Sequence, residues 1–545
     1  MDKTIIFLKN SIKNFKFCLI ISSLVNIVLT QNFNYQEGDW FVIPKSKSVN
    51  SITETAENIL FGTDNGIFLQ NRFTKEIIYD FFNSQELISK RVYHILYDKN
   101  TDYYWVVHDL GISYKASISR YWRNISFSEI KLNSFLQIKR IGYSSEAIWL
   151  DYDFGSIALD RFNGNVVNVD NISPIHWCSS KNENYIDIFN YNFSNDWIKT
   201  SNKIINRKSN IEYIPTIEYE NNFGENWLVA NSGLIFYGKY GWLESAFLGI
   251  PQNNITEVYL DEFGSWWFAS SSYKNNNFEK FFSSSFLGDA EIFLTHWDEN
   301  ENKWNYYYNN ESVSIKDYNI NKILRVKDKL YLGTLDGLLI LDISQKEWSN
   351  LNKNLYDKAV WDMALLDDTI YIATSNGINK ISLFSNIILS IEESLLRHYI
   401  GKEIYKLIAH NDELYIMSEI GLEKVNFKDK SIKHLSSKFL KDFELDKNRI
   451  FINDGKISEI LYSNDLVQEK YIYNEGNDIC ISDNFIWTTI NQYVKLIDMD
   501  NGNYWTYSNE DGILGDIIYN INCDTEWVWF STNKGISYYN WRKFH

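Results

Sequence analysis

The stretch Tyr331-Leu332-Gly333-Thr334-Leu335-Asp336-Gly337-Leu338 decides the fold of this chain. It reads as an aromatic residue, an apolar residue, a small residue, threonine, two variable residues, glycine and an aliphatic residue. Side chains that alternate between two faces suit a β-strand, and glycine supplies a backbone angle that tight turns require. The stretch therefore predicts a β-hairpin, with one strand ending at Thr334 and the return strand beginning after the turn.

The same pattern recurs along the chain. Close copies repeat the whole unit, and looser copies keep the aromatic residue, with or without the glycine six residues later. Most units begin 35 to 48 residues after the preceding one. Another predicted strand precedes each hairpin and a fourth, often centred on Trp, follows it, which is typical of one β-propeller blade. The units begin at Leu60, Trp105, Trp149, Trp197, Trp227, Trp267, Tyr331, Tyr371, Tyr415, Ile450, Trp487 and Trp529.

The repeat predicts an all-β protein of about twelve four-stranded blades. A helical solenoid would instead show apolar residues spaced by three and four. Because propellers typically have four to eight blades, we expect two rings of six to seven blades. The largest gap between units places the boundary near residue 310, giving a first propeller over 31–310 and a second over 311–545. The early segment 39–42 resembles a fourth strand that could close a ring from the other end.

The gap between the units at Trp267 and Tyr331 also holds a Ser-, Asn- and Phe-rich stretch over 272–288. We interpret this stretch as an insertion within a blade. The aromatic residue that begins each unit stands at a fixed position, so we expect it to pack between blades.

The N-terminus reads as a signal peptide over residues 1–30. Four lysines precede a mostly apolar stretch over 17–29, which is too short to span a bilayer comfortably. The alternative is a buried helix of a cytosolic domain. Cys18 lies at the start of the apolar stretch, so it does not resemble a lipid-attachment cysteine. We therefore expect a secreted, periplasmic or cell-surface protein.

Three cysteines follow the predicted signal peptide: Cys178, Cys480 and Cys523. Their odd number and wide spacing do not indicate a disulfide framework. Cys480 and Cys523 are about one repeat apart, and packed sheets lie about 10 Å apart, too far for a disulfide. Buried free thiols are therefore expected.

The net charge of −17 disfavours nucleic acid as a partner, because the chain would repel phosphate backbones. No run after residue 30 reaches the 18 apolar residues of a membrane span. We therefore expect a monomer without a membrane span, whose partner is a protein or a glycan.

No motif predicts a catalytic residue, a bound cofactor or a metal site. The histidines lack ligand spacing, and neither a nucleophilic G-x-S-x-G motif nor a phosphate-binding glycine loop occurs. The segments 160–165 and 498–503 superficially resemble calcium loops but lack the closing glutamate, so hairpin turns are the better interpretation. A histidine at position 108 is expected to be a solvated turn residue.

The unit resembles the two-component regulator propeller repeat, and its best match runs from Pro251 through Asp261 and Gly264 to Trp267-Phe268. The resemblance covers nearly the whole chain after the signal peptide. It implies the propeller fold, and in that family such propellers form the sensing exterior of membrane kinases. A pair of exported propellers is also distantly similar to the PorZ-type component of type IX secretion. The last unit ends close to His545, so no further C-terminal domain is expected.

Candidate binding residues lie in the hairpin turns, which should project on the same side of each ring. Loops on a rigid scaffold are where binding residues concentrate, although polar residues are needed in turns for structural reasons as well. The candidates are Asp64, Asn65, His108, Asp109, Tyr152, Asp153, Asp336 and Asn376.

Two functions follow from the sequence. The first is a secreted or envelope-associated binding or scaffold protein that recognises a protein or ligand, in surface sensing or secretion. The alternative is a propeller enzyme, a lyase or glycosidase, that acts on extracellular polysaccharide. The absence of a convergent catalytic motif favours the protein without enzymatic activity. A ring centre holding two carboxylates or a metal would favour the enzyme.

Overall fold

The computed structural model describes most of the chain. The described residues are 35–36, 38–45, 47–132, 138–169, 173–181, 186–252, 255–269, 292–298, 303–308, 319–383, 387–389, 395–463 and 466–545. The predicted signal peptide at 1–30 and the predicted insertion at 272–288 lie outside these residues.

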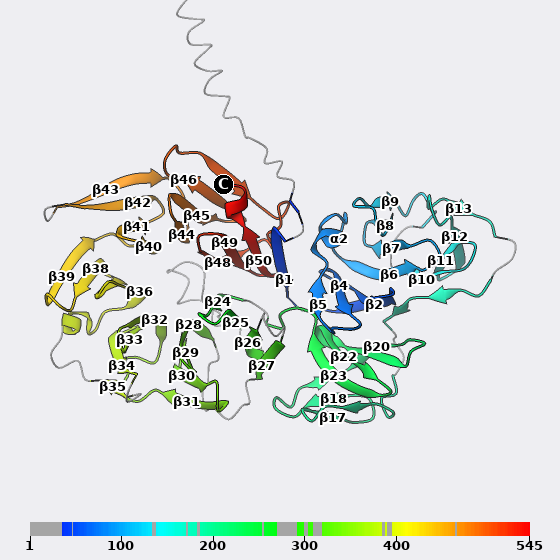
Figure 1. Ribbon diagram of the computed structural model, residues 1–545, viewed down its shortest axis with the longest axis horizontal. Coiled ribbons are helices and arrows are strands. Elements are labelled where there is room, and N and C mark those ends of the chain that lie inside the picture. Colours follow the sequence, from blue (N-terminus) through cyan, green and yellow to red (C-terminus); the bar gives the residue numbers. More distant parts are fainter. Residues whose placement is uncertain are drawn as a thin grey trace, which may run out of the picture. The chain divides into compact units, whose positions relative to one another are not determined.

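The described residues form twelve β-sheets, which confirms the all-β class and the twelve predicted units. Each predicted unit start lies on a strand of its own sheet. Seven of the sheets surround a common centre (Figure 1), and we call them the seven-sheet ring. The other five sheets are formed by residues 49–247 and are called the five-sheet group. The division is less even than the expected six to seven blades per ring.

Each sheet of the seven-sheet ring has four antiparallel strands. The first three sheets contain β24 (Glu257–Leu260), β25 (Ser265–Ala269), β26 (Ile292–Asp298) and β27 (Lys303–Tyr308); β28 (Ile320–Val326), β29 (Lys329–Thr334), β30 (Gly337–Asp342) and β31 (Glu347–Leu351); and β32 (Val360–Leu366), β33 (Thr369–Thr374), β34 (Gly377–Ser382) and β35 (Ile388–Leu389).

The next three sheets follow in chain order. They contain β36 (Ile404–His410), β37 (Glu413–Ser418), β38 (Gly421–Asn426) and β39 (Ser431–Ser436); β40 (Asp442–Asp446), β41 (Arg449–Asn453), β42 (Ile457–Ser463) and β43 (Leu466–Tyr473); and β44 (Ile479–Ser482), β45 (Phe485–Ile490), β46 (Tyr493–Asp498) and β47 (Tyr504–Tyr507).

The last sheet of the ring joins the two ends of the chain. It contains β48 (Ile518–Cys523), β49 (Trp527–Thr532), β50 (Gly535–Asn540) and, as its fourth strand, β1 (Trp40–Pro44). The register pairs Trp40 with Tyr539 and Pro44 with Gly535. This confirms that the early segment acts as the fourth strand of a blade. We call this sheet the closing blade.

The closing blade packs against the sheet of residues 257–308, because the rings of Trp529 and Trp266 meet edge to face at 5.7 Å. The sheet of residues 257–308 also shares a core with the sheet of residues 320–351. The sequence had assigned these two sheets to different propellers. We propose instead that 40–44 and 257–540 form the seven-sheet ring and that 49–247 form the five-sheet group.

The five-sheet group is less regular. It contains β2 (Val49–Glu54), β3 (Asn58–Thr63), β4 (Gly66–Asn71) and β5 (Ile77–Tyr79); β6 (Val92–Asp98), β7 (Tyr103–His108), β8 (Gly111–Ala116) and β9 (Arg123–Ile125); β10 (Ile138–Tyr143), β11 (Ile148–Tyr152), β12 (Gly155–Leu159) and β13 (Val166–Val167); β17 (Trp197–Lys199), β18 (Ile204–Asn206) and β19 (Glu212–Tyr213); and β20 (Pro215–Glu220), β21 (Glu225–Ala230), β22 (Leu234–Lys239) and β23 (Trp242–Phe247). Three short strands join its edges: β14 (His176–Trp177), β15 (Ser179–Ser180) and β16 (Asn192–Phe193).

Helices are short in the part of the chain that the structure describes. They are α2 (Phe81–Gln85) and the 3-10 turns η2 (Asn231–Gly233), η4 (Leu395–Tyr399) and η5 (Trp541–Lys543). None of these helices has the length and apolar character needed to cross a membrane.

The repeated threonine and glycine form each hairpin turn. The hydroxyl of Thr334 donates to the carbonyl oxygen of Gly337 at 2.8 Å and accepts from the N–H of Asp336 at 3.0 Å. The same two bonds recur at Thr63, Thr374 and Thr532. Gly337 has a φ of +114°, and a Cβ there would collide with Asn352. The unit is therefore conserved within the chain because a side chain and a backbone angle close the turn together.

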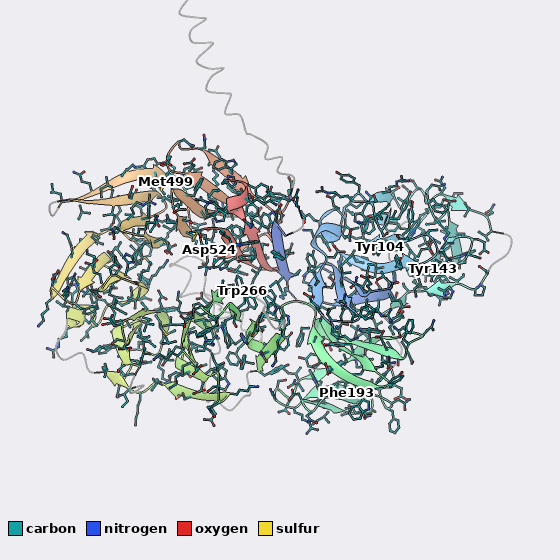
Figure 2. The ribbon with its side chains drawn as sticks, in the orientation of Figure 1. Tyr104, Tyr143, Phe193, Trp266, Met499 and Asp524 are labelled. Carbon is teal, nitrogen blue, oxygen red and sulfur yellow. A yellow bond between two sulfur atoms is a disulfide. The ribbon has the colours of Figure 1, made fainter. Side chains whose placement is uncertain are left out.

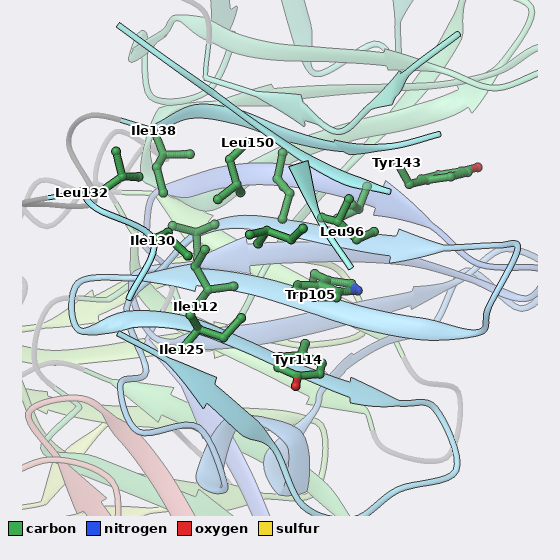
Figure 3. Close-up of a cluster of buried hydrophobic side chains, with 14 of the residues drawn as sticks. Leu96, Trp105, Ile112, Tyr114, Ile125, Ile130, Leu132, Ile138, Tyr143 and Leu150 are labelled. Atoms are coloured by element: carbon green, nitrogen blue, oxygen red, sulfur yellow. The ribbon is translucent and has the colours of Figure 1, made fainter. Parts of the chain in front are cut away.

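The aromatic residues of the units are core residues, as expected. Trp227 of β21 is 1% exposed and its Nε1 donates to Oε1 of Gln70 on β4 at 2.8 Å, so it packs between two sheets. Trp105 packs in the core between the sheets β6–β9 and β10–β13 (Figure 3). Labelled aromatic side chains such as Tyr143 and Trp266 lie on the strands of both regions (Figure 2). Packing between sheets thus accounts for these side chains.

The prediction of free thiols is wrong for two cysteines. Cys480 of β44 and Cys523 of β48 form a disulfide, with their Cα atoms 5.9 Å apart. The prediction used the spacing of sheets packed face to face, but the inner strands of neighbouring blades converge at the ring centre. Cys178 is buried and free, as predicted.

Candidate functional site: the channel of the seven-sheet ring

The inner strands of the seven-sheet ring surround a cavity of about 620 Å³, which we call the channel. Its volume lies within the range of small-molecule binding sites. In each sheet, the channel is lined by the residue directly before the inner-strand residue that packs against the preceding blade. These positions hold Glu257, Lys322, Asp362, Lys406, Asp442, Asp478 and Asn520.

Charged groups of neighbouring blades pair around the channel. Nζ of Lys322 lies 3.4 Å from Oδ1 of Asp362 and 4.0 Å from Oε1 of Glu257. Nζ of Lys406 lies 2.7 Å from Oδ1 of Asp442 and donates to Glu444 as well. Asp362 raises the pKa of Lys322 more than burial lowers it. The carboxylates beside Lys406 likewise keep its pKa above the ordinary value despite burial, so both lysines are charged. Lys322 contacts carboxylates of two sheets, and Lys406 contacts two carboxylates of one strand.

The aspartates also bind the backbone of the following blade. Asp362 accepts from the N–H of Leu407 at 2.8 Å, Asp442 from Ile479 at 3.0 Å and Asp478 from Ile521 at 3.0 Å. These bonds hold the carboxylates in fixed orientations toward the channel, which is the preorganisation that a binding site needs. They also stabilise the contact between blades, so the same residues serve the fold.

The charges along the channel do not balance. Between Lys406 and the closing blade, the repeated position holds Asp442, then Asp478, then the neutral Asn520. Glu444 adds a further carboxyl group, whose pKa is raised by burial, and Lys441, which also lines this side, donates to the amide oxygen of Asn477 rather than to a carboxylate. This side of the channel is therefore its acidic side.

Aromatic side chains lie at one mouth of the channel. A β-bulge at the start of several inner strands pushes one extra residue out of register, and Trp361, Tyr405 and Tyr519 occupy these positions. All three side chains are partly exposed. Nε1 of Trp361 donates to the hydroxyl of Ser375 at 2.8 Å, so this mouth borders the hairpin turn that contains Asn376. The turn face predicted from the sequence and the channel mouth thus meet here.

The predicted turn residues of the seven-sheet ring have structural partners. Oδ1 of Asp336 accepts from Nζ of Lys358 at 2.8 Å. Nδ2 of Asn376 donates to the carbonyl oxygen of Tyr356 at 3.3 Å. The two turns belong to neighbouring sheets. A role of Asp336 and Asn376 in binding stays a prediction.

The first pair of predicted turn residues in the five-sheet group is also bonded. Oδ1 of Asp64 accepts from Nδ2 of Asn50 at 3.0 Å. Nδ2 of Asn65 donates to the carbonyl oxygen of Lys45 at 3.0 Å. The bonds connect this turn to nearby segments rather than to the other predicted turns.

The remaining predicted residues differ in exposure. Asp109 and Asp153 are exposed, and Asp153 lies 3.2 Å from Nζ of Lys139. Tyr152 is partly exposed. Their role in binding likewise stays a prediction.

The expectation of a solvated His108 is wrong, because its side chain is fully buried. Its Nδ1 accepts from the N–H of Leu110 at 3.2 Å, which is the bond that threonine makes in other units. Its Nε2 donates to Ser113 at 2.8 Å, and burial lowers its pKa to about 4. His108 therefore closes a turn in the neutral form and is not a ligand-facing residue.

The channel residues were not predicted from the sequence, although a signal for them exists. In six sheets of the ring, the polar or charged channel residue stands nine residues before an aromatic residue of the second strand that packs between blades. Lys322 precedes Tyr331 in this way, and Asp478 precedes Trp487. A charged residue repeated at one place in apolar strands is unusual, because charges are seldom buried without a partner. The prediction relied on the hairpin turns and therefore missed this second repeated position.

Among the residues described, no group of three or more His, Cys, Asp and Glu side chains is placed to hold a metal ion. The channel does hold two neighbouring carboxylates, Asp442 and Glu444, and both contact the same lysine, Lys406.

No protein-family model matches the sequence, and no curated protein matches it. Solved structures do resemble the chain. The extracellular domain of the hybrid two-component system BT4673 from B. thetaiotaomicron has 12% identity and a TM-score of 0.37, covering 90% of this chain and 75% of that one. The corresponding domain of BT3049 from the same organism has 14% identity and a TM-score of 0.34, covering 93% and 77%.

A third similar structure is PorZ, a bacterial surface component of the type IX secretion system of Porphyromonas gingivalis. It has 11% identity and a TM-score of 0.36, covering 92% of this chain and 87% of that one. Both classes of protein that the repeat resembles are present among these similar structures.

Proposed function

We propose that this chain is an exported β-propeller binding protein that takes a ligand into the channel of its seven-sheet ring. The observation that carries the proposal is the set of fixed charges at one repeated strand position around a cavity of about 620 Å³. Packing alone would favour apolar residues at that position, because buried ion pairs seldom stabilise a fold more than apolar packing does. The expected role is recognition within a surface sensor or secretion scaffold.

The chemistry of the channel favours a ligand with a positively charged group. Asp442 and Asp478 offer carboxylates on the acidic side, and the aromatic mouth at Trp361 and Tyr519 suits a cation over a ring face. A short basic peptide has both features, since its ammonium or guanidinium group can enter while its backbone stays at the mouth.

Export is supported by two features of the chain. The predicted signal peptide is one, and the disulfide between Cys480 and Cys523 is the other, because disulfides persist mainly in oxidising compartments. Whether the protein remains in the periplasm or reaches the cell surface is part of the proposal that localisation of the tagged chain would test.

The binding proposal is tested by calorimetric titration of the purified chain with trilysine and with triglutamate. We expect saturable binding of trilysine only, weakened at least tenfold in Asp478→Asn, which removes the charge but keeps an acceptor for Ile521. Asp429→Asn, an exposed turn carboxylate outside the channel, is the matched control and should bind as the unaltered chain does. Equal binding by Asp478→Asn, or no binding of trilysine, would contradict the proposal.

A second function, polysaccharide cleavage, is favoured by one observation. Glu444, whose pKa is raised by burial, stands two residues from Asp442 in the channel, and carboxyl groups with different pKa values can act as acid and base. Both carboxylates contact Lys406, which favours a structural role. Turnover of a panel of acidic and neutral polysaccharides, lost in Glu444→Gln, would establish the enzyme instead.

A further inference from the structure

A second, smaller pocket lies beside the closing blade. It has a volume of about 300 Å³ and is separate from the channel, because the two share no lining residue. Its lining combines apolar side chains with lysines, amides and one exposed glutamate, Glu510. The residues are Pro44, Asn65, Gln85, Lys90, Asn509, Glu510, Leu514, Gly515 and Lys534.

The two lysines of this pocket lie close enough to repel each other. Lys90 is partly buried, and burial together with the charge of Lys534 lowers its pKa. No carboxylate contributes to the pKa of Lys90. Among the described residues none forms a salt bridge with it, whereas Lys534 lies 3.2 Å from Oδ2 of Asp516. Charged side chains that leave water are normally paired, but Lys90 has no such counterion among the residues that the structure describes.

Several of the other polar groups of the pocket are engaged. Nε2 of Gln85 donates to the carbonyl oxygens of Asn509 at 2.8 Å and Glu510 at 3.2 Å. Nδ2 of Asn65 donates to the carbonyl oxygen of Lys45. These bonds fix the wall of the pocket and leave the ammonium of Lys90 as its distinguishing group.

A lysine near the pocket adds to the positive charge. The backbone N–H of Lys45 donates to the carbonyl oxygen of Lys534 at 2.8 Å, so Lys45 stands at the rim. Burial and the neighbouring Lys47 lower its pKa. In a chain with a net charge of −17, several lysines at one corner are a local exception that would attract a negative ligand.

We propose that this pocket binds a small organic oxyanion, a carboxylate or phosphate group carried on an apolar body. The negative group would lie beside Lys90 and Lys534, and the apolar body against Pro44 and Leu514. Pro44 and Leu514 both line the pocket, so its wall includes apolar side chains. The volume exceeds that of an inorganic ion, since one water occupies about 30 Å³ in the liquid. This site goes beyond the proposed function and does not depend on the channel.

The probes are benzoate, acetate and inorganic phosphate, each titrated at constant ionic strength against a chloride reference. We expect a saturable rise of the melting temperature and saturable heat in calorimetric titration with benzoate, and a weaker effect with acetate. Inorganic phosphate distinguishes the two head groups: tighter binding than acetate would assign phosphate esters, and weaker binding would assign carboxylates. Either ranking supports an oxyanion site.

Lys90→Gln should weaken benzoate binding at least fivefold while the melting temperature without ligand stays within a few degrees. Lys534→Gln should weaken it less, because Asp516 already offsets that charge. The control is Lys358→Gln, a lysine with a carboxylate partner on another turn, which should leave binding unchanged. The proposal is overturned if no probe exceeds the chloride effect, or if Lys90→Gln binds as tightly as the unaltered chain. Trilysine binding in the channel is expected to persist in Lys90→Gln, so failure of the two proposals can be told apart.

Discussion

The seven-sheet ring and the five-sheet group are built from the same repeat, yet their centres differ. In the ring the inner strands line the channel with charged side chains. In the five-sheet group a segment of the chain itself joins two inner strands: β14 pairs with β10, and β15 pairs with β2. The repeat therefore specifies blades, and the residues between blades decide whether the inner edges are available to a ligand.

A histidine fixes this segment in the five-sheet group. Nε2 of His94 lies 3.1 Å from the carbonyl oxygen of Ile138 and therefore donates to it, so in the neutral ring Nδ1 accepts from the hydroxyl of Ser180 at 2.8 Å. Where Lys322 and Lys406 of the ring are charged, His94 is neutral, because burial lowers its pKa to about 4. We infer that the five-sheet group supports the structure while the seven-sheet ring binds.

The largest expected effect separates the two regions by stability. Trp227→Ala should destabilise the five-sheet group by about 3–5 kcal/mol, as a large-to-small change at a buried site that also leaves Gln70 without its partner. Calorimetric unfolding measures the loss, and hydrogen exchange should place it in residues 49–247. The control Trp242→Ala removes a side chain that is 68% exposed and should have little effect. A melting profile unchanged by Trp227→Ala would contradict the assigned packing.

The disulfide tests the ring in the same way. Replacing Cys480 and Cys523 by serine should lower the free energy of unfolding of the ring by about 3–4 kcal/mol, since the bond closes a long loop in the unfolded chain. Chemical denaturation with and without reductant measures the effect. Cys178→Ser should keep the sensitivity to reductant, because Cys178 is free. Loss of exchange protection in the five-sheet group alone would be incompatible with the structure.

Acid should act on the five-sheet group through His94. Its pKa is about 4 in the folded chain and about 6.5 when unfolded, so only the unfolded state takes up a proton between these values. The stabilisation is complete above pH 6.5 and is lost as pH falls toward 4, by about 2–3 kcal/mol at pH 4.5. His94→Gln should flatten this part of the pH profile of unfolding. His410→Gln, on the ring, is the control, and a profile unchanged by His94→Gln would show that the histidine does not titrate as assigned.

The smallest effect should be equal in the two regions. Thr63→Val and Thr334→Val each remove a hydroxyl that makes two turn bonds, and each should cost about 1 kcal/mol. Thermal unfolding of the two variants measures the difference. A much larger loss at one site would mean that the two turns are not equivalent.

The sequence predicted the blades because each unit uses local chemistry. In each unit the threonine and the glycine close a turn, and the aromatic residue fills a core. All three lie within 40 residues of one another, so their pattern repeats along the sequence and can be recognised there. The role of residues 39–42 in closing a ring could also be predicted, because this segment resembles the fourth strand of a blade.

The channel and the disulfide were not predicted, because both depend on how blades meet. Cys480 and Cys523 come within bonding distance only where inner strands converge, and no local pattern reports that convergence. Likewise Lys406 meets Asp442 across a blade boundary. His108 was misjudged because a histidine can replace the turn-closing threonine, which the pattern of residue types does not show.

The closing blade has a consequence for the order in which the protein folds. β1 and β50 are the first and last of the described strands, so the closing blade cannot form until the chain between them is available for folding. The sheets of residues 49–247 have all their strands much earlier. The N–H of Ile250 donates to the carbonyl oxygen of Pro44 at 3.0 Å, so the segments on either side of the five-sheet group are held together. Early folding of the five-sheet group would thus shorten the effective loop between β1 and β50 and lower the entropy lost when the ring closes.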